Sequence, residues 1–440
     1  MPISDLESLI ATKKARLAVI GLGYVGLPVA AIFAEKGFDV LGVEIRSDRV
    51  EMINDGKSPI EGDEPGLEEL LNRVVGGQKL RATANYEDLR DRDVVLIDVE
   101  TPVDETHVPR YEALKSACRN LASVLKNGAL VIIESTIAPG TMNGTVLPLL
   151  QEKGLKLNQD FYLGNCPERV MPGKLLANLR LMSRVCGGNS PDTAKAMISL
   201  YSTIVEADLD SADWATAELV KTVENTYRDI QIAFANEVAL ICEQAGADVL
   251  RVRELVNKSP FRQMHIPGAG VGGHCIPKDP WLLAYGVQNN EVPLQLIPAA
   301  RAVNDGMPRH MVGLVEKALS RQNKKIDQSR ILVMGYAYLE NSDDTRNSPS
   351  AALVGGLDAL GAEVVIHDPF VEEYKGDLFA KAAGCDAVVI MVRHNEYLHL
   401  DLAELKAKLR TPILVDGRRV FNPEKAVEIG FEYSGVGFGI

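Results

Sequence analysis

One stretch near the start of the chain limits the possible folds more than any other. Residues 15–37, ARLAVIGLGYVGLPVAAIFAEKG, have the pattern of a buried strand, a glycine-rich turn and a helix, and FDVLGVEI at 38–45 has the pattern of a second strand. Together they predict a βαβ unit, which commits this part of the chain to a parallel sheet.

The rest of the chain extends this pattern and divides it into three regions. In residues 1–200, RDVVLIDVETP and GALVIIESTIAPGT read as further buried strands. In residues 201–320, one helix is predicted from Trp214 to the residue before Gly246, with apolar positions on more than one face. Residues 321–440 alternate strands and helices again without a GxGxxG turn. We predict an α/β protein with two doubly wound Rossmann-like domains joined by a long central helix.

Composition limits the class of partner. The net charge of −13 disfavours nucleic acid and acidic membranes as partners and indicates a small molecule. Charges are scattered through the N-terminal segment and no apolar run approaches ~18 residues, so we expect a cytoplasmic protein. The six cysteines form no CxxC pair, which predicts reduced thiols, five of them packing residues, and no bound metal.

The GLGYVG turn predicts dinucleotide binding because it follows a strand and opens a helix. Gly21 would allow the tight turn, Gly23 the approach of the pyrophosphate, and Gly26 close packing of the helix. Glu44, at the end of the second strand, suits the adenosine ribose hydroxyls and favours NAD. Arg46 and Arg49 keep NADP as an alternative, and a tight turn without ligand is the simpler interpretation.

Three further features could be catalytic or binding residues, or could be solvent-exposed side chains without such a role. Lys221 and Asn225 share one helix face and could both donate to an oxyanion, or could simply be solvated. Glu168, in the loop NCPERVMPG, could be a general base or a surface acid. Arg346, in SDDTRNSP, could bind phosphate or carboxylate, or lie in a capping loop.

The stretch GAGVGGHCIPKDP, residues 268–280, presents one thiol after a glycine run. Cys275 lies four residues before an acid, Asp279. The residue pattern by itself leaves the purpose of this thiol open.

These motifs resemble, in the same order along the chain, those of the UDP-glucose/UDP-N-acetylmannosamine dehydrogenase family. The matching segments are GLGYVG, ESTIAPGT, CPERVMPG, ELVKTVENTYRDIQIAFANE, PGAGVGGHCIPKDP and SDDTRNSP. The amino-acid sequences of the helix and of the cysteine loop resemble those of the family branch that acts on UDP-N-acetylhexosamines, particularly UDP-N-acetylmannosamine. UDP-N-acetylglucosamine and UDP-glucose are alternative substrates. The resemblance implies NAD-dependent four-electron oxidation of the sugar C6 alcohol to a uronic acid, as used in polysaccharide biosynthesis.

The resemblance also implies roles for individual residues. Cys275 would be the nucleophile that forms a thiohemiacetal and then a thioester, Lys221 and Asn225 the oxyanion donors, Asp279 and Thr136 the water-positioning groups, and Glu168 the proton-transfer group. NAD would be bound by Gly21, Gly23, Tyr24, Val25, Gly26, Glu44, Arg49 and Thr101. The UDP-sugar would be bound by Arg169, Lys221, His265, Gly272 and Arg346. Residues 1–200 would bind NAD, 201–320 would carry the cysteine loop and a homodimer or larger homo-oligomer interface, and 321–440 would bind the UDP-sugar.

The chain departs from the family pattern at three positions. Leu339 stands where the family usually has a lysine, Glu44 replaces a more common aspartate, and Arg110 replaces a frequent acid. Two other function classes fit parts of the sequence: a two-electron hydroxyacid dehydrogenase in which Cys275 is incidental, and a nucleotide-sugar sensor that does not turn over its ligand.

Overall fold

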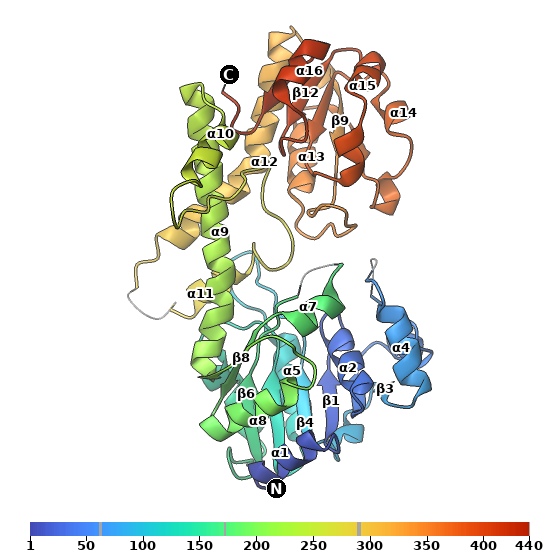
Figure 1. The fold of residues 1–440 in the computed structure, drawn as a ribbon, viewed down its shortest axis with the longest axis vertical. Helices are drawn as coiled ribbons and strands as arrows, with labels where there is room; N and C mark the ends of the chain where they lie inside the picture. Colours follow the sequence, from blue (N-terminus) through green and yellow to red (C-terminus); the bar gives the residue numbers. More distant parts are fainter. Residues whose placement is uncertain (61–63, 171–172, 288–291, 440) are drawn as a thin grey trace. The chain divides into compact units, whose positions relative to one another are not determined.

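The chain forms two compact units in a computed structural model that describes residues 1–60, 64–170, 173–287 and 292–439. The first unit comprises Met1–Glu224 with Trp281–Val292, and the second comprises Asn225–Pro280 with Pro293–Ile440 (Figure 1).

The first unit is built on an eight-stranded sheet with the order β3-β2-β1-β4-β5-β6-β7-β8. Its strands are β1 (Arg16–Ile20), β2 (Asp39–Val43), β3 (Leu80–Thr83), β4 (Val94–Ile97), β5 (Ala129–Ile133), β6 (Phe161–Asn165), β7 (Arg184–Gly188) and β8 (Leu209–Asp213). All neighbouring strands are parallel except β6 and β7. The order reverses between β1 and β4, and ligands of open α/β sheets bind outside the carboxyl ends of strands at such a point.

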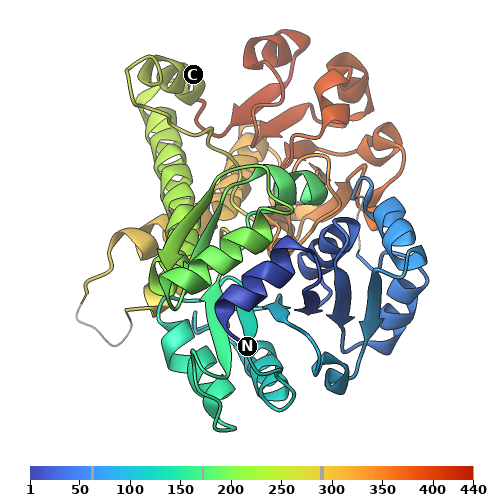
Figure 2. The same ribbon diagram turned by 60° about the horizontal axis from the view of Figure 1, so that its bottom comes forward.

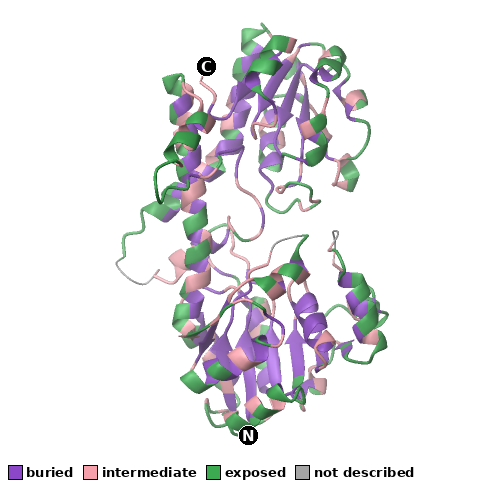
Figure 3. Cartoon of the chain, in the orientation of Figure 1, coloured by how far each residue is buried: buried purple, intermediate pink, exposed green. Residues whose placement is uncertain are grey.

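Helices cover both faces of this sheet. They are α1 (Ile3–Ala11), α2 (Gly26–Glu35), α3 (Ser47–Asn54), α4 (Leu67–Gly76), α5 (Glu112–Ala122), α6 (Leu147–Gln151), α7 (Leu175–Leu181) and α8 (Pro191–Tyr201). Figure 2 shows α1 lying along α8, and Figure 3 shows the central strands buried. On β1, Leu17 and Val19 belong to the core on one face and Ala18 and Ile20 to the core on the other. Burial on both faces explains why these strands read as continuous apolar runs.

The predicted long helix is confirmed as α9 (Trp214–Ala245), which supplies residues to both units. It is followed by Gly246, whose φ of 70° is the left-handed conformation that favours glycine after a helix. Three further helices follow, α10 (Val249–Val256), α11 (Asp279–Tyr285) and α12 (Leu296–Arg321). The sequence pattern did not predict α12, because Gly306 and Pro308 interrupt it.

The second unit holds a five-stranded, fully parallel sheet with the order β10-β9-β11-β12-β13. Its strands are β9 (Arg330–Met334), β10 (Glu363–His367), β11 (Ala387–Ile390), β12 (Ile413–Asp416) and β13 (Glu432–Gly435), and its remaining helices are α13 (Pro349–Ala359), α14 (Leu378–Ala382), α15 (Leu402–Lys408) and α16 (Pro423–Ile429). The order reverses between β9 and β11. The predicted fold class, two doubly wound domains with a long central helix, is confirmed.

The cysteines follow the expected division. Five are buried, and Cys275 is the exposed one of the six. Among the described residues, no helix combines the length and apolar character that a membrane span requires.

Candidate active site

In the glycine turn after β1, two glycines are packed too closely to accept a side chain and one has open space beside it. Gly21 has φ 94°, and a Cβ there would lie 2.4 Å from the carbonyl oxygen of Asp98. A Cβ at Gly26 would lie 2.0 Å from the carbonyl oxygen of Gly21. A Cβ at Gly23, in contrast, would meet no atom of the described residues within 4 Å. The chain is thus closed around Gly21 and Gly26 and open at Gly23, directly before the N-terminus of α2, which suits a pyrophosphate.

Glu44 follows β2 and is held by its own loop. Its carboxylate accepts the N–H of Arg46 at 3.1 Å and lies 4.0 Å from Nε of Arg49. Arg49 Nη2 donates to the carbonyl of Leu22 at 3.3 Å, so this arginine connects the loop after β2 to the glycine turn. Because the guanidinium of Arg49 lies beside Glu44, its charge is partly balanced by that carboxylate, which fits NAD better than an additional phosphate.

Tyr24 and Val25 complete the turn. Val25 precedes α2, and its carbonyl accepts the N–H of Val29 at 3.1 Å.

The Tyr24 hydroxyl hydrogen-bonds to Glu64. The carboxylate of Glu64 also accepts the N–H groups of Gly173 at 2.7 Å and Leu175 at 3.3 Å. Glu64, which the sequence analysis missed, therefore connects the turn to the segment that follows Glu168. The only signal for it is an acid in the proline-bounded stretch before α4.

Two predicted residues meet at the carboxyl ends of β4 and β5. Thr101 is buried, and its hydroxyl donates to the carbonyl of Thr136 at 2.6 Å. This bond joins the loops on two neighbouring strands, beside the point where the sheet order reverses.

Glu168 is a buried acid rather than a surface one. Its carboxylate lies 2.5 Å from Nη2 of Arg184 and accepts the N–H of Arg169 at 2.7 Å. Arg184 also lies 3.0 Å from Glu134, which accepts the Tyr201 hydroxyl at 2.6 Å. Burial raises the pKa of Glu168; the charge of Arg184 opposes the shift and that of Glu134 adds to it. An acid with a raised pKa is suited to carrying a proton. Sequence reasoning missed Glu134, which directly follows β5, and Arg184, the first residue of β7.

Arg169 and Lys221 lie in the first unit with different surroundings. Arg169 Nε donates to Glu224 at 2.9 Å, and its Nη1 donates to the carbonyl of Ser183 at 2.6 Å. Lys221 lies on α9, three residues before Glu224, and is half-buried. The guanidinium of Arg169 thus has protein partners.

In the second unit, Asp279 is the first residue of α11, and Cys275 lies four residues before it, in the loop that leads into the helix. The N–H groups of Lys278 and Asp279 donate to the carbonyl of Cys275 at 3.1 and 2.8 Å. The buried carboxylate of Asp279 accepts the amide of Asn225 at 2.5 Å and lies 3.0 Å from Nζ of Lys278. The structure therefore brings together three of the predicted catalytic residues.

The glycines before Cys275 are needed by packing within the second unit. A Cβ at Gly272 would lie 2.6 Å from Cβ of Tyr338, and one at Gly273 would lie 2.6 Å from the Tyr338 ring. These two glycines are followed by a histidine, His274, which directly precedes Cys275.

The pKa of His274 is lowered to about 4 by burial and by the charges of Lys278 and Arg346. His274 is therefore neutral at pH 7.

The remaining predicted substrate residues also lie in the second unit. Arg346 is in the loop after β9, with Nε 2.9 Å and Nη2 2.5 Å from Asp344, and the half-buried Leu339 is in the same loop. His265 contacts Gln231 at 3.2 Å, and its pKa is lowered by burial and by Arg228 and Arg253.

Arg418, which sequence reasoning missed, follows β12. It donates to the carbonyls of Met391 at 2.8 Å and Gly270 at 3.1 Å, and burial lowers its pKa. The signal in the sequence is GRR after a buried strand. Among the described residues, no group of three or more His, Cys, Asp and Glu side chains is arranged to hold a metal ion.

The chain is similar to known proteins over most of its length. Residues 15–205 match the NAD binding domain of the UDP-glucose/GDP-mannose dehydrogenase family, residues 215–306 its central domain and residues 332–423 its UDP binding domain. The chain belongs to this family. It is therefore an NAD-dependent oxidoreductase that acts on nucleotide sugars.

Individual relatives in this family cover nearly the whole chain. A UDP-N-acetyl-D-mannosamine dehydrogenase from Pyrococcus horikoshii is 40% identical over 96% of this chain and 99% of its own length. The solved structure of a UDP-D-ManNAc dehydrogenase from that organism matches over the same shares with a TM-score of 0.91. An NDP-N-acetyl-D-galactosaminuronic acid dehydrogenase from Methanosarcina mazei Go1 is 37% identical, with a TM-score of 0.87 over 100% of this chain and 98% of that one. Similar family members thus carry names with different amino sugars.

Proposed function

We propose that the protein oxidises the C6 alcohol of a UDP-N-acetylhexosamine, with UDP-N-acetylmannosamine as the first candidate, to the uronic acid in the cytoplasm for polysaccharide biosynthesis. The observation that carries the proposal is the exposed thiol of Cys275, four residues before a buried carboxylate, Asp279, that accepts the amide of Asn225. The choice of sugar is supported by the names of the relatives from Pyrococcus horikoshii and other organisms.

The first unit fits NAD. Gly23 leaves space for the pyrophosphate, Gly21 and Gly26 shape the turn, and Glu44 with Arg49 lies where the ribose hydroxyls would be held. When bound, NAD supplies the acceptor for the hydride in each of the two oxidations. We assign Tyr24, Val25 and Thr101 to the same site.

The thiol explains how one enzyme performs both oxidations. The first oxidation converts the C6 alcohol to an aldehyde, and Cys275 Sγ adds to that aldehyde to form a C–S bond. The second oxidation leaves a thioester, and water then adds, breaks the C–S bond and releases the thiolate and the carboxylate. In sum, one alcohol, one water and two NAD⁺ give one carboxylate, two NADH and three protons.

The other residues hold charge or protons in this scheme. Lys221 and Asn225, one turn apart on α9, are assigned as donors to the oxyanion. Glu168, whose pKa is raised, is assigned to proton transfer, and Asp279 and Thr136 to holding the hydrolytic water. Arg169, Lys221, His265, Gly272 and Arg346 are assigned to the UDP-sugar, and Arg418, a cation at the carboxyl end of β12, is added to them.

The proposed partner of the chain is a second copy of itself. Five large apolar side chains on α9 are exposed and recur at intervals close to whole helical turns, which places them along one side of the helix: Leu219, Val223, Tyr227, Phe234 and Ile241. An apolar stripe of this length on a water-soluble helix indicates an interface. We therefore propose a homodimer or larger homo-oligomer.

The test is a measurement of NADH formed per sugar consumed. UDP-N-acetylmannosamine, UDP-N-acetylglucosamine, UDP-N-acetylgalactosamine and UDP-glucose should be compared by kcat/KM, with absorbance at 340 nm following NADH. We expect about two NADH per sugar and no released aldehyde, as the covalent route requires. A ratio near one would instead support the two-electron alternative, and no turnover with any of the four would contradict the proposed activity.

A further inference from the structure

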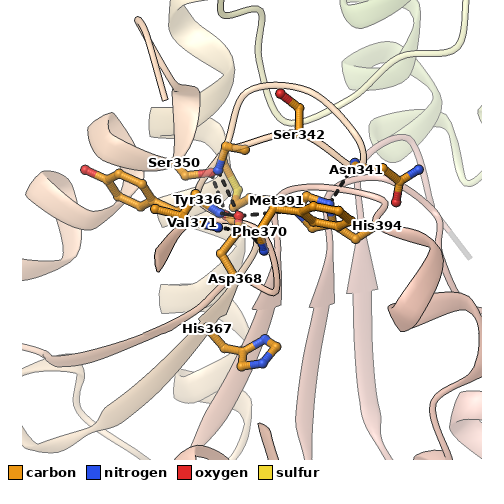
Figure 4. A network of polar contacts seen from close by, with 12 residues as sticks. Tyr336, Asn341, Ser342, Ser350, His367, Asp368, Phe370, Val371, Met391 and His394 are labelled. Atoms are coloured by element: carbon orange, nitrogen blue, oxygen red, sulfur yellow. Dashed lines mark hydrogen bonds and ion pairs between the residues drawn. The ribbon is translucent and has the colours of Figure 1, made fainter. Parts of the chain in front are cut away.

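A buried histidine and a buried aspartate meet where the strand order of the second sheet reverses. Asp368 directly follows β10, and His394 lies in the segment after β11 (Figure 4). His394 Nε2 and Asp368 Oδ2 are 3.2 Å apart, and both side chains are 0% exposed. Most buried polar side chains form hydrogen bonds, so the other partners of these two residues show which parts of the chain the pair holds.

Asp368 fixes the start of the loop that follows β9. One carboxylate oxygen accepts the N–H groups of Phe370 at 2.8 Å and Val371 at 3.1 Å in its own turn. The other accepts the N–H groups of Tyr336 at 2.6 Å and Ala337 at 2.9 Å. Burial raises the pKa of Asp368, but the hydrogen bonds from His394, Ala337 and Tyr336 outweigh it, and the pKa lies below the usual range.

His394 fixes the middle of the same loop. Its Nδ1 accepts the N–H of Asn341 at 2.9 Å. Because a backbone N–H can only donate, Nδ1 carries no proton, and the ring proton is on Nε2, which donates to Asp368. Asn341 Oδ1 in turn accepts the N–H of Asn395 at 2.8 Å, so the loop and the segment after β11 are joined by two bonds.

The far end of this loop holds the cysteine loop. The N–H of Gly273 donates to the carbonyl of Arg346 at 2.9 Å, and Asn347 Nδ2 donates to the carbonyl of Gly273 at 3.0 Å. The ring of Tyr338 lies against the same glycine, which is two residues before Cys275. Residues 336–347, here called the β9 loop, thus run from the His394–Asp368 pair to the backbone beside the thiol.

We propose that His394 and Asp368 are positioning residues that hold the β9 loop in the conformation that fixes the Cys275 backbone and presents Arg346. An exposed loop without such anchors samples many conformations. A displacement of about 1 Å at a reacting group can cost about 10²-fold in rate. The role of the thiol and of Arg346 rests on the proposed function, whereas the restraint on the thiol loop does not.

The first test replaces His394 and measures the thiol directly. Because Cys275 is the exposed cysteine of the six, its alkylation by iodoacetamide without substrate reports on its loop. In His394→Ala we expect the alkylation rate to change about fivefold or more and kcat/KM for the UDP-sugar to fall about 10²-fold, with KM for NAD within about twofold of the parent value. His399→Ala, an exposed histidine of the same unit, is the matched control.

Two isosteric variants separate positioning from general destabilisation. His394→Asn keeps an acceptor near the position of Nδ1, and His394→Gln keeps a donor near that of Nε2. Since the Nδ1 bond reaches the β9 loop, Asn should restore kcat/KM and the alkylation rate better than Gln. Equal restoration by both variants would contradict this part of the proposal.

A loop variant keeps the proposal testable if His394→Ala does not fold. Asn341 is exposed with φ 54°, so Asn341→Gly suits the backbone while removing the bond to Asn395. We expect it to shift the alkylation rate and kcat/KM in the direction of His394→Ala. Parent alkylation rates and kcat/KM in Asn341→Gly, or in a folded His394→Ala, would overturn the proposal. If no UDP-sugar is oxidised by the parent, the proposed function fails, and the alkylation rates alone decide the positioning role.

Discussion

Asn225 Nδ2 donates a hydrogen bond to Oδ2 of Asp279 at a distance of 2.5 Å. Asn225 lies within α9 and Asp279 is the first residue of α11, so the bond joins two helices through residues that both belong to the second unit. The other carboxylate oxygen lies 3.0 Å from Lys278 Nζ, and the N–H of Asp279 donates to the carbonyl of Cys275. One oxygen of the acid is therefore held by a hydrogen bond and the other by an ion pair, and its backbone is tied to the residue that carries the thiol.

Replacing this acid should separate thioester formation from hydrolysis. Asp279→Asn keeps the size of the side chain but places an amide opposite the amide of Asn225 or the ammonium of Lys278. We expect steady-state kcat to fall about 10²-fold, with a rapid first burst of about two NADH per active site, because hydrolysis would become the slow step. Stopped-flow absorbance measures both phases, and Asp192→Asn, on the surface of α8, is the control. An unchanged kcat would remove Asp279 from the mechanism.

Features that depend on residues close together in the sequence could be predicted from the sequence alone. The roles of Gly21, Gly23 and Gly26 could be argued from spacing alone, because strand, turn and helix are consecutive. The length of α9 followed from an uninterrupted run without proline that stops at Gly246. The doubly wound fold followed from the alternation of buried strands and helices.

Contacts between distant segments could not be predicted in this way. Glu134 and Arg184 surround Glu168 only because β5 and β7 lie on either side of β6, an order that no local pattern contains. His394 and Asp368 are likewise joined by the order of β9, β10 and β11. The glycines before Cys275 appeared to serve a ligand, whereas the structure shows that Tyr338, from a separate segment, also requires them.

The glycine turn offers a matched pair of substitutions. Gly23→Ala meets no atom of the described residues within 4 Å, so the free protein should keep its stability while its KM for NAD rises about tenfold or more. Gly26→Ala would place Cβ 2.0 Å from the carbonyl oxygen of Gly21 and should reduce both stability and NAD binding. Thermal unfolding and NAD titration of both variants make the comparison. Equal destabilisation by the two would contradict the open space at Gly23.

His274 should make the protein less stable in acid. Its pKa is lowered from 6.5 to about 4 in the folded state, so between these values the unfolded chain binds more protons than the folded one. Stability from this residue is therefore complete above pH 6.5 and is lost as the pH falls toward 4. At about pH 5 the loss should be about 2 kcal/mol relative to neutral pH. His274→Gln should lack this loss in urea unfolding at the two pH values, and equal pH dependence in both proteins would show that His274 titrates normally.

The exposed apolar stripe on α9 predicts that a charged side chain placed in it will dissociate the oligomer. Phe234 is 58% exposed near the middle of the stripe, and Phe234→Glu would place a carboxylate in the proposed interface. We expect the molar mass measured by light scattering to fall to that of a single chain at micromolar concentration. Leu181→Glu, a substitution at a 63% exposed position of the first unit outside the stripe, should leave the mass unchanged. A single-chain mass for the parent protein would contradict the proposed homo-oligomer directly.

Replacing Cys275 tests the covalent route itself, because every other assigned residue could serve a simpler dehydrogenase. The side chain is exposed, and the shape of its loop comes from glycines packed against Tyr338, so Cys275→Ala should bind NAD and UDP-sugar nearly as the parent does. Formation of the uronic acid should then fall by several orders of magnitude, because no C–S bond can form. If Cys275→Ala makes the acid at the parent rate, the thiol is not the nucleophile.

Cys275→Ser provides the more specific readout of the same step. A serine oxygen could add to the aldehyde and the adduct could be oxidised, but the resulting ester hydrolyses more slowly than a thioester. We therefore expect this variant to stall with the sugar nucleotide attached through an ester, and intact-protein mass spectrometry after incubation with substrate and NAD would detect the added mass. The alanine variant treated identically should show no adduct. An adduct on both variants would place the covalent bond on a residue other than Cys275.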